Sequence, residues 1–422
     1  MRILIHGINY TPEQIGIGKY TGEMAAWLAK QGHEVRVVTA PPYYPSWKVS
    51  KEYEAWQYQR ETLSGVSIFR CPLWVPSKPT ALKRIIHLAS FAISSFPVMI
   101  KQITWKPAIV LAIEPPLFCA PQALLTSRLA RAKSWLHIQD FEVAAFFGLG
   151  FASSGFLRKC TIKIEGLLTR RFDVVSSISP TMLQRLTGLQ VSKSRTYLFP
   201  NWVDTEYIRP GPKENDLRSA WGFSPGQKII LYSGNLGKKQ GLDMILDAAE
   251  GLMGEQPEAV FLIVGDGAAK PDLVANAARR KLHNILFKPL QPLEKLPRLL
   301  AMADVHLVIQ KRGAADAVMP SKLTGILAVG GFLVITADEH TELGKLVLNN
   351  PGIAELVEPE SANALIAALK HLLCRPATIP YYNHVAREYA ERNLSTDGIM
   401  TMVENKLCQL AAASENNEKQ RA

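Results

Sequence analysis

The sequence predicts an α/β protein with two doubly wound parallel sheets, one in each half of the chain. Its 422 residues exceed what one ordinary hydrophobic core holds, so we expect two domains of about 200 residues each. In both halves, short apolar runs alternate with amphipathic helical segments, as in parallel sheets that are covered by helices. Two such sheets facing each other would form a cleft at the carboxyl ends of their strands, where ligands of these folds bind.

The first half, residues 1–200, opens with a strand–helix–strand unit. Residues 3–5 and 35–38 are apolar strand candidates, and the segment between them carries apolar residues at helical spacing. Further strand candidates follow at 108–113, 134–138 and 173–178.

The second half, residues 201–381, repeats the same alternation. A stretch spotted with Pro and Gly, residues 199–227, separates it from the first half and places the boundary near residue 200. The strands expected are 228–234, 259–265, 284–290, 304–310 and 332–336, and the helices expected are 241–251, 270–281 and 293–302. A last helical pattern, 382–412, is expected to return to the first domain, and the polar residues 413–422 form a loose tail.

Composition limits the class of protein. Hydrophobic residues make up 47% of the chain and charged residues 20%, which is typical of globular domains. The net charge of +11 indicates an anionic partner, without distinguishing nucleic acid, an anionic membrane or a phosphorylated substrate. Five scattered cysteines without C-x-x-C spacing favour neither a disulfide framework nor a zinc site, and they fit a reducing cytosol.

Targeting and membrane-spanning segments are not expected. The chain starts directly with the strand sequence MRILIHGINY, so a cleaved signal peptide is not predicted. The most apolar window, 85–100, is interrupted by His87, three serines and Pro97 and falls short of the roughly 20 residues that a spanning helix needs.

The stretch AADAVMPSKLTGILAVGG, residues 314–331, predicts a loop that leads into a short helix. Pro320 suits its first helical position, and Gly330 is placed to end it. Backbone N–H groups at its start, the Ser321 hydroxyl and the Lys322 ammonium would converge there, as they do around a bound phosphate. The alternative is an ordinary capped helix with a surface lysine.

Three other strand-to-helix loops are rich in glycine. The first, GINYTPEQIGIGKYTGE, holds Gly16 and Gly18 but lacks the spacing and the acidic residue of a dinucleotide fingerprint. The loops of the second half are SGNLGKKQGL, with Lys238 and Lys239, and VGDGAAKPDL. Each alone fits a flexible turn, but the loops of the second half, together with the Pro-Ser-Lys stretch, favour a nucleotide diphosphate ligand.

Two further positions could carry chemistry. His137 ends the strand SWLHI, where a neutral imidazole can hydrogen-bond a substrate hydroxyl, although a histidine at a strand end is more often structural. The segment QKRGAADAV brings Lys311, Arg312 and Asp316 just before the short helix, where an arginine can clamp a phosphate. These charges equally fit a solvated loop. His137, Asp140 and Glu142 lack the spacing of metal ligands.

These motifs resemble a retaining glycosyltransferase of family 4 with the GT-B fold. The matching strings run over nearly all of residues 1–410: INYTPEQIGIGKYTGEMAAWLAKQGHEVRVVT, the His137 strand end, SGNLGKKQGLDMILDAA, FLIVGDG and PSKLTGILAVGGFLVIT. APPYYP, HIQDFEV, QKRGAADAVMPSKLT and VAREYAER are similar to the subgroup that builds bacterial exopolysaccharide such as colanic acid.

The resemblance implies a reaction and its partners. A sugar, in this subgroup fucose from GDP-fucose, would pass with retention of configuration to a sugar on undecaprenyl diphosphate. The acceptor-side domain would be residues 1–200 and the nucleotide-sugar domain 201–381. The enzyme would use no metal or other cofactor, and it would sit peripherally on the cytosolic face of the membrane.

The resemblance also assigns residues, with departures from the family pattern. Gly16 and Gly18 would lie against the diphosphate, His137 against the donor sugar, and Gly265, Asp266 and Gly267 beside the base. Asn235 and Gln240 stand where the family has Arg and Lys, so the charge of the leaving group would be met by Lys238, Lys239, Arg312 or Lys322.

The paired glutamates of the family are also missing. They would fall on Ala317 and Gly325, so Asp316 is the candidate to replace the first of them, with Ser321 and Lys322 taking up phosphate and ribose contacts.

Residues 79–107 combine Lys83, Arg84 and Lys101 with apolar residues, as in an element that lies on an anionic bilayer. A buried helix with solvated ends is the alternative. Two other functions also fit: a nucleotide-sugar epimerase on the same fold, and a binding-only protein with a decayed active site. Nucleic-acid binding is disfavoured, because the basic residues are dispersed over separate loops.

Overall fold

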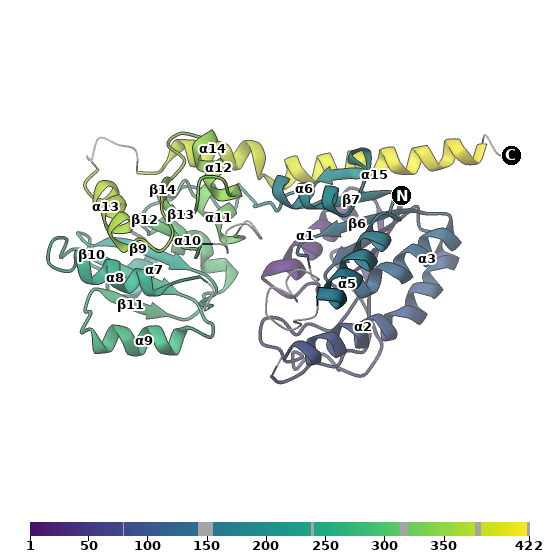
Figure 1. Cartoon of the computed structure of the whole chain (residues 1–422), viewed down its shortest axis with the longest axis horizontal. Helices are drawn as coiled ribbons and strands as arrows, with labels where there is room; N and C mark the ends of the chain where they lie inside the picture. Colours follow the sequence, from purple (N-terminus) through teal and green to yellow (C-terminus); the bar gives the residue numbers. More distant parts are fainter. Residues whose placement is uncertain (79, 142–154, 238–239, 313–319, 376–380, 420–422) are drawn as a thin grey trace. The chain divides into compact units, whose positions relative to one another are not determined.

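The computed structural model describes residues 1–422 apart from 79, 142–154, 238–239, 313–319, 376–380 and 420–422. Two compact units make up the chain (Figure 1). Unit 1 consists of Met1–Pro200 together with Ile399–Ala422, and unit 2 of Asn201–Gly398.

Unit 1 is built on an eight-stranded sheet in the order β3-β4-β2-β1-β5-β6-β7-β8. All neighbours are parallel except β3 and β4, which pair antiparallel. Strands β1 and β5 are buried along most of their length, which explains their continuous apolar sequences. The strands of unit 1 are β1 (Arg2–His6), β2 (Glu34–Thr39), β3 (Gln59–Leu63), β4 (Val66–Arg70), β5 (Ile109–Glu114), β6 (Lys133–Ile138), β7 (Val174–Ser177) and β8 (Thr196–Leu198).

Helices cover the sheet of unit 1, and α6 starts with typical capping residues. Helix α6 begins at Ser179, whose hydroxyl accepts a hydrogen bond from the Met182 N–H, and it has a proline in its first turn. The helices of unit 1 are α1 (Gly16–Lys30), α2 (Ala81–Lys101), α3 (Ala120–Ala130), α5 (Gly155–Thr169), α6 (Pro180–Gly188) and, from Ile399 onward, α15 (Thr396–Lys419).

Helix α2 has two chemically distinct faces. One stripe, spaced four residues apart, is buried in unit 1 and consists of His87, Phe91, Ser95 and Met99. The opposite stripe is exposed and apolar and consists of Leu82, Ile86, Ile93 and Phe96. By length and composition the segment Leu82–Trp105 could cross a membrane, which the sequence window 85–100 did not indicate, but its buried stripe ties it to the core of unit 1.

Unit 2 has a six-stranded, wholly parallel sheet in the order β11-β10-β9-β12-β13-β14. The strand order reverses between β9 and β12, which makes their carboxyl ends the topological switch point of this sheet. The strands are β9 (Lys228–Ser233), β10 (Ala259–Val264), β11 (Ile285–Lys288), β12 (Val305–Val308), β13 (Leu333–Thr336) and β14 (Glu355–Val357).

Successive residues of these strands enter cores on opposite faces of the sheet. Ile229 and Leu231 of β9 pack on the face that α11 covers, whereas Ile230 and Tyr232 pack on the face that α8 covers. The helices of unit 2 are α7 (Asp216–Ala220), α8 (Asp243–Leu252), α9 (Lys270–Arg279), α10 (Leu296–Ala301), α11 (Lys322–Ala328), α12 (Glu342–Asn349), α13 (Ala362–Leu373) and α14 (His384–Asn393).

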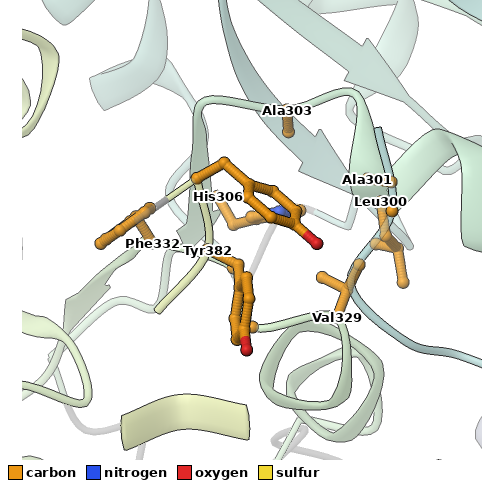
Figure 2. Close-up of a pocket in the computed structure, with 11 residues that line it drawn as sticks. Leu300, Ala301, Ala303, His306, Val329, Phe332 and Tyr382 are labelled. Atoms are coloured by element: carbon orange, nitrogen blue, oxygen red, sulfur yellow. The ribbon is translucent and has the colours of Figure 1, made fainter. Parts of the chain in front are cut away.

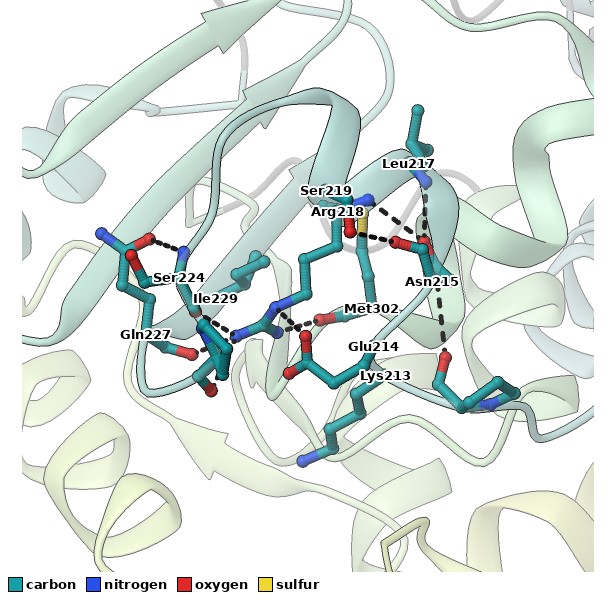
Figure 3. Close-up of polar contacts among 12 residues, drawn as sticks. Lys213, Glu214, Asn215, Leu217, Arg218, Ser219, Ser224, Gln227, Ile229 and Met302 are labelled. Atoms are coloured by element: carbon teal, nitrogen blue, oxygen red, sulfur yellow. Dashed lines mark hydrogen bonds and ion pairs between the residues drawn. The ribbon is translucent and has the colours of Figure 1, made fainter.

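A buried arginine, Arg218, holds together the segments at the start of unit 2 (Figure 3). The Arg218 guanidinium of α7 donates hydrogen bonds to the backbone carbonyls of Met302 and Ser224, and it pairs with the Glu214 carboxylate at 3.2 Å. Its side chain is only 2% exposed. Because a charge in this position needs partners, Arg218 links the segment before β9 to the turn before β12.

The stretch expected as one helix, 382–412, contains two. Helix α14 packs against α11 in unit 2, and α15 then runs through unit 1, where Glu404 accepts a hydrogen bond from His33 at 2.8 Å. The break falls at Leu394 and Ser395, where Val203 donates its N–H to the Leu394 carbonyl. Helix α15 continues to Lys419, beyond the point where the loose tail was expected to start.

Candidate functional site

The carboxyl edge of the unit 2 sheet brings most of the candidate residues of the second half together. The loop after β9 begins at Gly234, the loop after β10 at Gly265, and the segment after β12 leads to Lys311 and Arg312. Ligands of doubly wound sheets bind outside the carboxyl ends of the strands at the switch point. In unit 2 that point lies at the carboxyl ends of the neighbouring strands β9 and β12.

The glycine-rich loops after β9 and β10 pack closely against each other. A Cβ on Gly265 would lie 1.9 Å from the Gly234 carbonyl oxygen, and a Cβ on Gly267 would lie 2.4 Å from the Leu236 carbonyl oxygen. The Leu236 N–H donates to the Asp266 carbonyl at 2.8 Å. Gly265 and Gly267 are therefore needed for the close approach of one loop to the other, a structural reason that the sequence did not show.

Asn235 and Asp266 lie at the exposed rim of these loops. The Asn235 carbonyl accepts a hydrogen bond from the Tyr232 hydroxyl at 2.9 Å, and the Asp266 carboxylate accepts one from the Gly267 N–H at 2.8 Å. Because both residues are exposed at the carboxyl edge of the sheet, they are accessible to a ligand there.

Lys322, the first residue of α11, is the most unusual group at this edge. Part of the residue reaches solvent, but its Nζ atom is buried and has no hydrogen-bond partner among the described residues. Nζ lies 3.5 Å from the centre of the Tyr232 ring and 3.7 Å from the place of a Cβ on Gly234. Desolvation lowers the pKa of Lys322 to about 7.

The start of α11 differs in detail from the expectation. Pro320 and Ser321 precede the helix, which begins at Lys322, and the Ser321 side chain is exposed and caps no N–H group. Gly330 follows the helix with φ +65°, in agreement with its predicted role as a stop. At seven residues α11 is short, so the anion-binding capacity of this corner depends on the Lys322 side chain.

Two other cations near the edge are in different situations. The Lys311 stem lies against Gly241, because a Cβ there would be 2.8 Å from Lys311 Cγ. Arg312 is held by two carboxylates, Asp338 at 3.4 Å and Glu358 at 2.7 Å, so a diphosphate would have to compete for it. Of the predicted residues, Lys238, Lys239 and Asp316 lie outside the described part of the chain.

In unit 1, Gly16 and Gly18 form the first turn of α1. Gly16 has φ +63°, and Gly18 lies against Glu13, whose carboxylate would be 2.5 Å from a Cβ at this position. The buried Glu13 carboxylate accepts hydrogen bonds from the N–H groups of Tyr43 and Tyr44. Gly18 thus makes room for the carboxylate that ties the loop after β1 to the loop after β2, and sequence reasoning missed Glu13.

His137 lies at the end of β6 and is 2% exposed. Its Nδ1 is hydrogen-bonded to the Ser176 hydroxyl at 2.8 Å and its Nε2 to the Gln139 amide at 2.9 Å. Burial lowers the pKa of His137 to about 3, so the ring is neutral at physiological pH. With both ring nitrogens engaged, contact with a sugar would require one of these hydrogen bonds to open.

A pocket also occurs at the other edge of the unit 2 sheet (Figure 2). Its lining includes Ala303, just before β12, and Phe332, just before β13, together with His306 and Tyr382. These are the amino ends of the strands, so the pocket is not at the switch point where the ligand rule places a nucleotide. Within the described ranges, no three His, Cys, Asp or Glu side chains are grouped as a metal site requires.

Comparisons with known families agree with this division of the chain. Residues 16–202 match the family described as glycosyl transferase 4-like domain, and residues 213–392 match glycosyl transferases group 1. The first matched segment falls almost entirely within the Met1–Pro200 part of unit 1, and the second falls within unit 2.

Individual relatives extend the likeness over the whole chain. The putative colanic acid biosynthesis glycosyl transferase WcaI of Escherichia coli (strain K12) is 48% identical over 412 residues, which cover 96% of this chain and 100% of that protein. Among solved structures, sucrose-phosphate synthase from Thermosynechococcus elongatus has a TM-score of 0.73 at 18% identity and covers 98% of this chain and 99% of its own.

The Anabaena protein Alr3699/HepE, solved in complex with UDP-glucose, has a TM-score of 0.68 at 14% identity and covers 97% of this chain and 100% of its own. At sequence identities of 14% and 18%, these two structures support the fold alone. The fold and the resemblance predicted from the sequence are thereby confirmed. The chain belongs to the GT-B glycosyltransferases, with a glycosyl transferase 4-like domain followed by a group 1 domain.

Proposed function

We propose that this protein transfers fucose from GDP-fucose to a lipid-linked sugar acceptor during assembly of colanic acid or a related exopolysaccharide, with retention of configuration. The observation that carries the proposal is the buried Lys322 ammonium, without a carboxylate partner among the described residues, at the switch point of the group 1 domain. A desolvated cation at this place fits the leaving diphosphate of a nucleotide sugar.

The relatives support the pathway and the donor class. The relative that is identical at 48% of positions is named for colanic acid biosynthesis, and it matches this chain along its whole length. The HepE structure contains UDP-glucose, a nucleotide diphosphate sugar, in the same overall fold. GDP-fucose and the undecaprenyl-diphosphate-linked acceptor follow from the sequence resemblance.

The roles of single residues in the reaction are part of the proposal. Asp316 would stand in for the first missing glutamate, and Lys322 would neutralise the diphosphate as the sugar leaves. Gly16, Gly18 and His137 would contribute from the acceptor-side domain. Because His137 is neutral, it would act as a hydrogen-bonding group and not as a positive charge.

The acceptor would be reached at the cytosolic face of the membrane, with the protein bound peripherally. The support is the exposed stripe of α2, Leu82, Ile86, Ile93 and Phe96, which is flanked by the exposed Lys83 and Lys101. Apolar side chains bordered by lysines suit the interface of a bilayer with anionic lipids.

The decisive experiment is sugar transfer by the purified protein. Radiolabelled GDP-fucose and a panel of other nucleotide sugars are offered with a membrane extract that contains lipid-linked glucose, in the presence of a chelator. We expect chelator-resistant label in the lipid fraction from GDP-fucose, and a strong loss of label with Lys322→Met but not with Lys345→Met. Lys345 is an exposed lysine on α12, so its variant makes the same chemical change away from the site.

Other outcomes identify the alternatives. If the label in the lipid fraction came from a different nucleotide sugar, that sugar nucleotide would be the donor instead of GDP-fucose. Tight nucleotide binding without transfer to any lipid would favour the binding-only protein, and conversion of a nucleotide sugar without an acceptor would favour an epimerase.

A further inference from the structure

We propose that the donor diphosphate binds to Lys322 together with one proton taken up from solution, and that Tyr232 positions this ammonium. The inference rests on the proposed function, because it assumes that a nucleotide diphosphate binds at the carboxyl edge of unit 2. It goes further by naming the protonation step that accompanies binding and the aromatic residue that holds the cation.

The geometry around Lys322 explains why a proton is involved. Lys322 comes from α11 on one face of the sheet, whereas Tyr232 packs into the core on the other face. The two side chains meet past the carboxyl end of β9, with Nζ 3.5 Å from the ring centre and beside Gly234. A ring face stabilises an ammonium, but it supplies no negative charge to balance one.

The charged groups on the surrounding elements do not supply that balance either. The Lys270 ammonium of α9 donates a hydrogen bond to the Gly265 carbonyl, and Arg312 after β12 is paired with Asp338 and Glu358. Lys311 adds a further positive charge. Among the described residues, no Asp or Glu forms an ion pair with Lys322. Desolvation is the single cause that lowers its pKa.

The consequence for binding follows from the sign of this shift. With a pKa of about 7, much of the free protein carries an uncharged Lys322 amine above neutral pH. A diphosphate beside Nζ favours the ammonium form, so it raises this pKa and the complex takes up a proton. Affinity for the nucleotide should then fall about tenfold for each pH unit above the pKa of the free protein.

Tyr232 acts through Lys322. It is fully buried, its hydroxyl donates to the Asn235 carbonyl, and its ring lies under Nζ. Replacing the ring with an aliphatic side chain removes the cation–π contact, which favours the neutral amine. The pH at which binding weakens should therefore move down in Tyr232→Leu and stay in place in Tyr232→Phe, which keeps the ring.

The test is calorimetric titration of the full-length protein with GDP and with UDP at pH 8, in two buffers of different ionisation enthalpy. The difference in observed heat gives the protons taken up. We expect uptake of about half a proton or more per nucleotide for the wild type, because the pKa of about 7 lies below the pH of the titration, and none attributable to this site in Lys322→Arg, whose guanidinium is always charged. Lys322→Met should bind at least tenfold more weakly without the uptake, and Lys345→Met should match the wild type.

The outcomes separate this inference from the proposed function. A nucleotide that binds the wild type with no proton uptake, or with the same uptake in Lys322→Met, overturns the inference and leaves the donor site in place. Failure of the wild type to bind either nucleotide overturns both. A pH profile that is unchanged in Tyr232→Leu removes Tyr232 from the proposal, and a structural role of the ring alone would not shift that profile.

Discussion

The Nζ atom of Lys322 lies 3.5 Å from the centre of the Tyr232 ring, so a buried amine that can take up a proton lies against an aromatic face at the switch point of the unit 2 sheet. In the free protein this arrangement is costly, because desolvation opposes the charge. Such a loss of folding stability is expected at a site where a protein binds an anion.

Lys322→Met should therefore stabilise unit 2 near neutral pH. The pKa is lowered from 10.5 to about 7, so between these values the unfolded chain holds the proton that the folded chain has lost. Wild-type stability should rise with pH across this window, by up to about 1.4 kcal/mol per unit, and the variant should lack this rise. Urea unfolding at pH 7, 8 and 9 measures it, and an equal rise in the variant would contradict the assignment.

Gly265→Ala should disrupt the donor loops. The added methyl would lie 1.9 Å from the Gly234 carbonyl oxygen, so the loops after β9 and β10 would have to separate. We expect nucleotide affinity to fall at least tenfold, together with a loss of roughly 2 kcal/mol in stability. The control is Gly226→Ala, where a Cβ meets open space; titration and thermal unfolding of both variants decide the point.

Arg218→Met should destabilise unit 2 by about 3 kcal/mol or more. The change leaves the Met302 and Ser224 carbonyls without their donor and removes the partner of Glu214. Arg298→Met removes an exposed ion pair with Asp216 and should cost less than about 1 kcal/mol. Equal effects of the two changes on chemical unfolding would show that the buried network carries no special weight.

Glu165→Gln should stabilise unit 1 at alkaline pH. Both carboxylate oxygens of Glu165 are buried without a hydrogen-bond partner among the described residues, and desolvation raises its pKa above the usual 4.5. The wild type loses stability as pH rises through the raised value, because the ionised form is disfavoured in the fold. The gain in the variant should be about 1 kcal/mol at pH 8 and absent at pH 4, with the exposed Glu54→Gln as control.

Ile93→Glu should weaken membrane binding. Ile93 is 75% exposed in the apolar stripe of α2, so the folded unit should tolerate the change while losing an apolar contact with lipid. Sedimentation with vesicles that contain anionic lipid should show a loss of about tenfold or more. Val274→Glu on α9 of unit 2, also an exposed apolar position, should bind vesicles like the wild type; equal losses would remove α2 as the contact.

The central strands of both sheets other than β4 could be predicted, because parallel strands buried on two faces have continuous apolar sequences, as in AVFLIVG. The edge strands β3, β8 and β14 could not, whereas the edge strand β11 was predicted within 284–290. Strand β3, with the sequence QRETL, is mostly exposed, and β8 and β14 have three residues each, so none of them carries an apolar pattern. The sequence predicted α14 and α15 as one helix, because the break between them at Leu394 and Ser395 contains no glycine or proline.

At the candidate site, the sequence placed Lys322 and the glycine-rich loops of the second half at the carboxyl edge of the sheet, where the structure has them, because strand ends and helix starts are local features. It did not reveal the partner of Lys322. Tyr232 lies ninety residues earlier in a buried strand, and only the fold brings its ring under the ammonium. The full engagement of His137 by Ser176 and Gln139 likewise depends on the neighbouring strand β7 and was not visible in sequence.

The return of α15 to unit 1 has a consequence for biogenesis. Unit 2 is contiguous in the chain, whereas unit 1 needs both Met1–Pro200 and the segment from Ile399, where Glu404 meets His33. Domains fold during synthesis in the order in which their residues leave the ribosome. The unit that is translated first is therefore the last to be completed. Its strands all precede Pro200, but it lacks the α15 segment until all of unit 2 has been synthesised.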